Sequence, residues 1–125
     1  DAYWEHFNGQ NHFDRAPGSG IIKKAAFDQV GGFSGERMIG DNEFWLKIGR
    51  YYPLVKFPVD LYWSRIHAGS ESQSDYAKEY DLLRKNIFSA AFAHTDCPLS
   101  EAEKAAILQQ IKKRSVKNKL LKLIR

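Results

Sequence analysis

The 125-residue chain has a single cysteine, Cys97, and few of the other features that mark secreted or membrane-spanning proteins. One cysteine cannot form an internal disulfide, and such sparse use is typical of a reducing compartment. No apolar run reaches the roughly 20 residues that a membrane-spanning helix needs. The N-terminus shows no signal peptide, but it begins with Asp1. We therefore expect the chain to be cut from a longer protein, and a targeting segment upstream of Asp1 remains an alternative.

Acidic residues are absent after Glu103, and this gives the C-terminal tail a charge of its own. The tail carries seven basic residues, Lys112, Lys113, Arg114, Lys117, Lys119, Lys122 and Arg125. Because the net charge of the whole chain is only +4, the body before residue 112 is slightly acidic. Basic and aromatic residues are not interleaved along one face, so nucleic-acid binding is not predicted.

Apolar residues make up 43% of the chain and aromatic residues 14%, which is enough to build a folded core. Residues 1–16 are rich in aromatics without a clean period, and we expect an irregular or short-helical segment that buries them. His6 and His12 are six residues apart, which suits neither one helix face nor one strand face. For these two histidines an ordinary surface role is favoured over metal ligation.

Periodicity and turn residues predict four helices and two strand-like segments. The expected helices are 23–30, 41–52, 74–94 and a last helix opened by a capping box from Ser100 to Glu103. The expected strands are 21–22, after the turn 17–20, and 54–66, where Pro58 makes an edge, a bulge or two pieces.

Three side chains are candidates for chemistry: Asp41, Glu43 and His67. Asp41 is either the N-cap of the helix 41–52 or a general base at the mouth of a loop. Glu43, two residues on, does not share its helix face, so a chelating pair is not expected. His67 follows a predicted strand and is either a loop histidine or a metal ligand.

The order of these motifs resembles one known family. Gly18-Ser19-Gly20, Gly31-Gly32-Phe33, Gly40 to Lys47 (GDNEFWLK) and Arg65 to Ser70 (RIHAGS) follow one another at spacings similar to those of family 2 glycosyltransferases. The resemblance covers roughly residues 17 to 72 and corresponds to the C-terminal half of those enzymes.

The resemblance implies an α/β fold, namely the C-terminal part of a GT-A fold that is mostly helical, with two or three short strands and two C-terminal helices. It implies an enzyme that moves a sugar from a nucleotide-sugar donor to a glycan or lipid-linked acceptor, with inversion at the anomeric carbon. Asp41 would be the general base and His67 a ligand of a divalent ion, Mg or Mn. Ser19, Gly20, Gly40 and Trp45 would contact substrate.

The chain departs from the family pattern in ways that define what to expect from it. Gly40 stands where the family often has Glu, and the Gln-x-x-Arg-Trp motif of polymer synthases is absent. No Asp-x-Asp motif is present, so we expect the nucleotide-binding half to precede Asp1 and the chain alone to be inactive. Residues 1–72 would be the acceptor-side half of the catalytic domain, and residues 73–125 a helical extension.

A different class of function also fits the tail. The basic and apolar segment 112–125 is typical of an interfacial helix, which would make the chain a non-catalytic module that docks on a partner protein or an anionic membrane. The alternative for the tail itself is a solvated helix end. The expected location is cytoplasmic, at the membrane surface where the tail binds lipid.

Overall fold

Helices are the only regular secondary structure in the described part of the chain. The computed structural model describes residues 2–56, 63, 65, 67, 69, 70 and 79–123, with side chains as far as residue 113. In chain order the elements are α1 (Ala2–Glu5), the π-helical turn η1 (His6–Gln10), the 3₁₀ turn η2 (Pro17–Ser19), α2 (Lys24–Gln29), α3 (Gly40–Tyr51), α4 (Tyr80–Ala93) and α5 (Glu101–Leu123).

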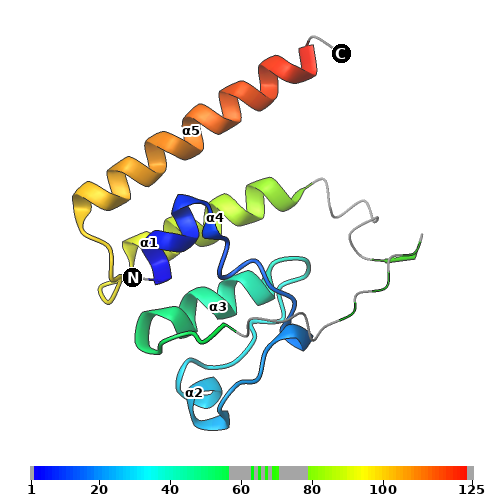
Figure 1. Ribbon diagram of the computed structural model, residues 1–125, viewed down its shortest axis with the longest axis vertical. Helices are drawn as coiled ribbons and strands as arrows, with labels where there is room; N and C mark the ends of the chain where they lie inside the picture. Colours follow the sequence, from blue (N-terminus) through cyan, green and yellow to red (C-terminus); the bar gives the residue numbers. More distant parts are fainter. Residues whose placement is uncertain are drawn as a thin grey trace.

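Helix α3 occupies the middle of the body, between α2 on one side and α1 and α4 on the other (Figure 1). It buries Gly40, Asn42, Phe44, Trp45, Leu46 and Ile48. Phe44 packs on the rings of Phe27 and Phe33, with centroids 5.3 Å and 4.4 Å away. On another face, Gly49 lets the Phe13 ring approach so closely that a Cβ there would lie 2.6 Å from Phe13 Cζ. The helix is therefore fixed by aromatic rings from α2 and from the segments before and after it.

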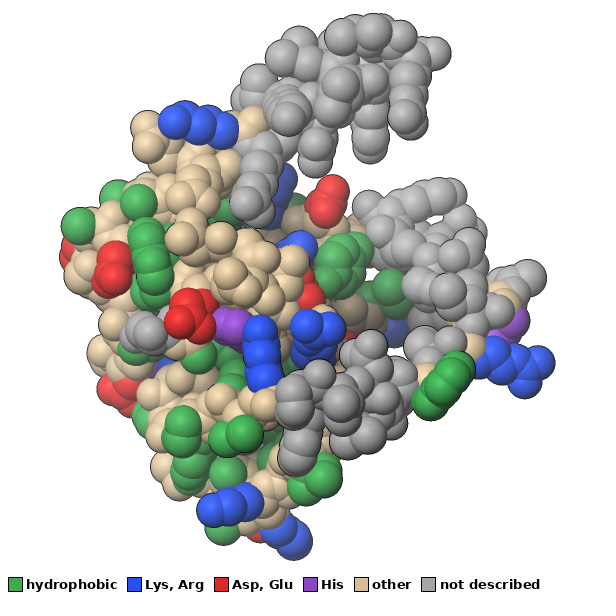
Figure 2. Space-filling model, viewed as in Figure 1, with side chains coloured by type: hydrophobic (Ala, Val, Ile, Leu, Met, Phe, Trp, Pro, Cys, Tyr) green, Lys and Arg blue, Asp and Glu red, His purple; other side chains and the backbone are tan. Residues whose placement is uncertain are grey.

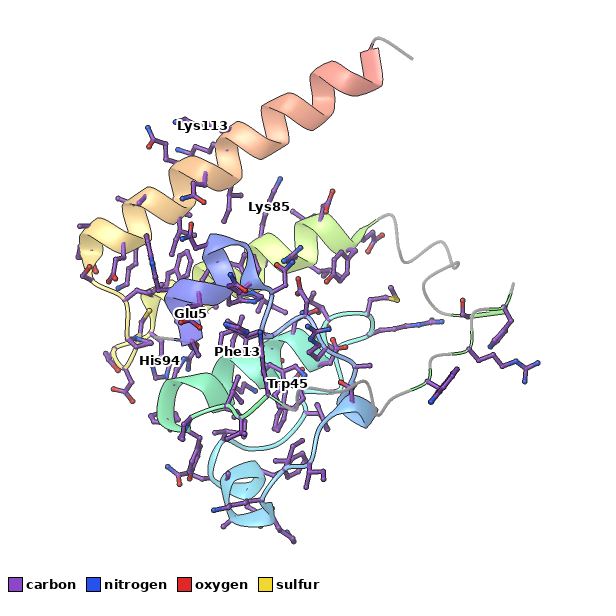
Figure 3. All side chains as sticks on the ribbon, in the orientation of Figure 1. Glu5, Phe13, Trp45, Lys85, His94 and Lys113 are labelled. Atoms are coloured by element: carbon purple, nitrogen blue, oxygen red, sulfur yellow. The ribbon has the colours of Figure 1, made fainter. Side chains whose placement is uncertain are left out.

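One hydrophobic core connects the N-terminal segment with the three longer helices. Among the described residues, the most deeply buried side chains of this core are those of Tyr3, Phe13, Phe44, Leu46 and Ile107. Figure 3 shows Phe13 in the interior beside α3 and Trp45 on α3 itself, whereas Lys113 lies on α5 away from the core. The prediction that residues 1–16 bury their aromatics is confirmed. The division at residue 72 remains a prediction, but side chains from both of its parts contribute to this core.

Helix α5 starts on the body and then runs away from it (Figure 1). Its start is the predicted capping box: Glu103 N–H donates to Ser100 Oγ at 3.3 Å, and Ser100 N–H donates to Glu103 Oε2 at 2.8 Å. Leu99 and Ile107 anchor this end, because both are buried in the core. None of the helices in the described residues combines the length and apolar character needed to cross a membrane.

The expected α/β fold is wrong for the part of the chain that the structure describes. That part contains no strand, so a GT-A fold with short strands is not supported. The predicted strand 21–22 is irregular backbone, and Ile21 is 96% exposed. A strand requires a neighbour that pairs with its backbone N–H and C=O groups, and no described segment supplies one. Leu54 to Lys56 form no strand either, and residues 57–62, 64 and 66 of the second predicted strand lie outside the described residues.

The predicted helices are confirmed where they are described, with shifted ends. The segment 23–30 forms α2, and Gly31 and Gly32 end it with φ of 77° and 63°. Of the helix expected over 74–94, residues 74–78 lie outside the described residues, and Tyr80–Ala93 forms α4. On the face shown in Figure 2, apolar side chains are interspersed with charged side chains of both signs.

Candidate functional site

Asp41 lines a polar pocket at the N-terminal end of α3. The pocket has a volume of about 220 Å³ and is lined by Asp14, Arg15, Ala16, Met38, Asp41, Asn42 and Tyr80. Three segments that are distant in sequence build it: the segment after the buried Phe13, the loop before α3 together with its first turn, and the start of α4.

Asp41 is not the N-cap of the helix, so that interpretation is wrong. The helix begins at Gly40, and the flanking residue is Ile39, which makes no side-chain cap. The preceding turn replaces the cap, because Gly40 N–H donates to the carbonyl of Glu36 at 3.0 Å. Asp41 therefore lies in the first turn, where the positive end of the helix dipole stabilises a carboxylate.

The two oxygens of the Asp41 carboxylate differ in their surroundings. Oδ1 accepts the backbone N–H of Asn42 at 2.8 Å, which fixes the orientation of the carboxylate. Within the described part of the chain, Oδ2 has no hydrogen-bond partner. A partly buried carboxylate with one oxygen held and one open can accept a proton from a bound hydroxyl.

Asn42, only 6% exposed, connects the three segments that form the pocket. Its Nδ2 donates to the Phe13 carbonyl at 3.2 Å and to Asp14 Oδ1 at 2.7 Å. Its Oδ1 accepts the Tyr80 hydroxyl at 3.1 Å. The Asn42 amide nitrogen faces two acceptors and the amide oxygen faces a donor, so the network determines the orientation of the side-chain amide.

Asp14 and Tyr80, the two partners of the Asn42 side chain, have further electrostatic interactions. Asp14 Oδ2 pairs with Arg84 Nη2 at 2.9 Å, so that α4 is linked to the N-terminal segment. Burial raises the pKa of the Tyr80 hydroxyl, and the carboxylates of Asp14 and Asp41 add to this while Arg84 opposes it. Tyr80 therefore keeps its proton at neutral pH.

The predicted metal ligand, His67, is exposed, and the residues on both sides of it lie outside the described ones. Among the described residues, no group of three or more His, Cys, Asp or Glu side chains lies together in a way that could hold a metal ion. The described residues thus do not fit a divalent-ion site, and ligation by His67 stays a prediction.

The four predicted substrate-contacting residues do not line the pocket with Asp41. Ser19 donates its hydroxyl to the Ala16 carbonyl at 2.6 Å. Gly20 makes room for the buried indole of Trp45, since a Cβ there would lie 2.8 Å from Trp45 Cη2. Trp45 Nε1 donates to the Arg15 carbonyl at 2.7 Å, which holds the pocket-lining segment in place. Gly40 is buried at the start of α3.

Sequence reasoning missed Asp14, Asn42, Tyr80 and Arg84. A signal existed for Asn42, because it shares the buried helix face with Trp45, Leu46 and Gly49, and a buried amide needs partners. The structure itself shows one more unusual feature of the pocket: the lining residue Met38 has a φ of 70°, which is uncommon outside glycine.

The surface role expected for the two N-terminal histidines is wrong for His6. Its ring is 3% exposed, and Nδ1 accepts the Phe13 backbone N–H at 3.2 Å. His12 Nε2 instead lies 2.8 Å from Glu5 Oε2. The two rings have different local partners, as ordinary structural histidines do.

Comparison with known proteins does not identify the chain: no protein-family model, no curated protein and no solved structure matches it.

Proposed function

We propose that this chain is the acceptor-side part of an inverting family 2 glycosyltransferase. The proposal rests on the resemblance of the motifs in residues 17–72 and on one structural observation. The carboxylate of Asp41, the residue that the resemblance assigns as general base, lies on the wall of a polar pocket with Oδ2 open. The assigned metal ligand and substrate contacts do not support the proposal.

In the proposed reaction, Asp41 acts on the acceptor. Its Oδ2 accepts the proton of an acceptor hydroxyl as the oxygen of that hydroxyl attacks the anomeric carbon of the donor sugar. The new carbon–oxygen bond forms on the face opposite the leaving group, and the bond to the nucleotide diphosphate breaks, with its electron pair going to the phosphate oxygen. Residues that precede this chain would hold the donor.

The test is Asp41→Asn in the full-length protein that contains this chain. Loss of the base should lower sugar transfer about 10²- to 10⁴-fold and leave nucleotide-sugar binding nearly unchanged. The matched control is Asp28→Asn, which removes an exposed carboxylate paired with Lys24 on α2 and should leave transfer unchanged. If transfer survives in the Asp41 variant, the carboxylate is only part of the helix start.

A second proposal concerns the tail. Helix α5 continues to Leu123, away from the body, and the sequence makes its last part basic and apolar. We propose that residues 112–125 bind an anionic membrane, which would place a cytoplasmic protein at the membrane surface. Sedimentation with phosphatidylserine vesicles should show binding that is lost on deletion of residues 112–125, and equal sedimentation would contradict the proposal.

A further inference from the structure

The pocket beside Asp41 has a second set of polar groups to which the proposed reaction assigns no role. Asp14 and Tyr80 face the same 220 Å³ space as Asp41, and the buried amide of Asn42 holds both of them at 2.7 Å and 3.1 Å. Such a fixed arrangement, built from segments that are distant in sequence, is what a polar ligand needs for oriented binding.

Counting donors and acceptors shows what this wall offers to a ligand. The Tyr80 proton is used on Asn42 Oδ1, so the Tyr80 oxygen is left to accept hydrogen bonds. Each oxygen of Asp14 already accepts one hydrogen bond, from Asn42 and from Arg84. A carboxylate has about four lone-pair sites, so each oxygen of Asp14 has room for one more hydrogen bond from a ligand. Together with Asp41 Oδ2, these oxygens line the pocket with hydrogen-bond acceptors, which match a ligand that carries several donors.

The charge around the pocket favours a neutral ligand. Two acidic residues, Asp14 and Asp41, are matched by two arginines, Arg84 in an ion pair with Asp14 and Arg15 among the residues that line the pocket. An anionic ligand would meet both carboxylates. A cation would compete with a guanidinium already in place, and no third acidic or histidine ligand is grouped with them in the described residues. Hydroxyl groups donate hydrogen bonds without adding charge.

The size of the pocket suits one small ring of a ligand. Its volume of about 220 Å³ is below the approximately 300–1,000 Å³ of sites for drug-sized ligands. Met38 is among the lining residues, and a methionine side chain is an adaptable apolar group that suits the C–H face of a sugar ring.

We propose that this pocket is the subsite for one monosaccharide unit of the acceptor. Asp14 and Tyr80 accept hydrogen bonds from hydroxyls of that ring, so that another hydroxyl faces Asp41, and Asn42 is the positioning residue for both. The assignment of the sugar as acceptor rests on the proposed function, whereas binding of the sugar does not.

The chain provides its own probe, since Met38 is the single methionine and lines the pocket. In the full-length protein with ¹³C-labelled methionine methyl groups, the resonance that disappears in the Met38→Leu variant is that of Met38, and it reports occupancy of the pocket. Methyl glycosides of glucose, galactose, mannose and N-acetylglucosamine are titrated, and at least one should shift the resonance saturably. Tetrahydropyran-2-methanol, which lacks the ring hydroxyls, should not.

Tyr80→Phe should weaken glycoside binding at least fivefold, because it removes an acceptor and the anchor on Asn42. The control Tyr51→Phe lies ten residues from Asp41 along α3, about 15 Å, and its hydroxyl bonds Asp96 at 2.7 Å, so binding should not change. Deoxy analogues of the best glycoside repeat the test on unaltered protein, and removal of at least one ring hydroxyl should abolish the shift.

Several outcomes would overturn the inference: no saturable shift with any glycoside, equal binding by Tyr80→Phe, or a larger effect of magnesium or sulfate ions. The two proposals fail separately. Sugar binding that depends on Tyr80, without transfer by the full-length protein, removes only the proposed function. Transfer that depends on Asp41, with an acceptor KM unaffected by Tyr80→Phe, removes only the subsite.

Discussion

The buried ring of His6 should make the folded state lose stability in a defined range of pH. The ring is 3% exposed and packs against the rings of Phe7 and Phe13, each with its centroid 4.8 Å away. Nδ1 already accepts the Phe13 N–H, so the folded state accommodates the neutral imidazole. Protonation would place a charge among aromatic side chains.

The magnitude follows from the pKa of His6 in the two states. Burial lowers it from 6.5 to about 4; the Asp14 carboxylate raises it, but Arg84 and His12 lower it further. Above pH 6.5 the ring is neutral in both states and has no effect. Between pH 6.5 and 4 only the unfolded chain takes up the proton, so the free energy of unfolding should fall by about 3 kcal/mol.

Urea denaturation at pH 7, 5.5 and 4 measures this loss. The matched variant is His6→Asn, whose side-chain oxygen can still accept the Phe13 N–H but which does not titrate. From pH 7 to 4 the unmodified protein should lose about 3 kcal/mol more than the variant. His94→Asn removes an exposed histidine and should behave like the unmodified protein. If His6→Asn has the same pH dependence as the unmodified protein, the burial argument is wrong.

Three further predictions concern stability, each measured by urea denaturation at pH 7. Gly49→Ala should destabilise, because its Cβ would lie 2.6 Å from Phe13 Cζ and overpacking of about 1–3 kcal/mol exceeds the gain in helix propensity. Gly40→Ala, whose Cβ would have no neighbour nearer than 3.6 Å, should instead stabilise by about 0.5–1 kcal/mol. If both glycine variants change the free energy of unfolding in the same direction, this packing argument is wrong. Ser100→Ala should cost about 1 kcal/mol by removing the α5 cap, and Ser100→Gly only a few tenths; no loss in the alanine variant would mean that the cap is not formed. Tyr3→Phe should cost about 1–3 kcal/mol, because the Tyr3 hydroxyl donates to a carbonyl of α3 and accepts from an arginine; unchanged stability would contradict those contacts.

Features that depend on neighbours in sequence were predicted well. The capping box at Ser100 and the glycine pair after α2 act over three or four residues, so the sequence pattern contains all of their partners. The strand at 21–22 was predicted wrongly because a strand depends on a distant neighbour, and Ile21–Ile22 has none in the described residues.

The polar pocket was not predictable in the same way. Asn42 and Asp14 are 28 residues apart, and Arg84 and Asp14 are 70 apart. Nothing in the spacing of such residues indicates that they meet. Only the presence of a polar Asn42 on an otherwise apolar helix face pointed to a buried network, without naming its members.

The contacts made by residues 13–15 decide how this protein can be divided. The motif resemblance begins near residue 17, so a shortened or chimaeric protein designed on motifs would start there and retain Asp41. It would lose Phe13, which fills the space above Gly49, and Asp14, which holds Arg84. It would also lose the Arg15 carbonyl to which Trp45 donates. The first sixteen residues therefore have to accompany α3 whenever this helix is retained in a shortened protein or transferred to another scaffold.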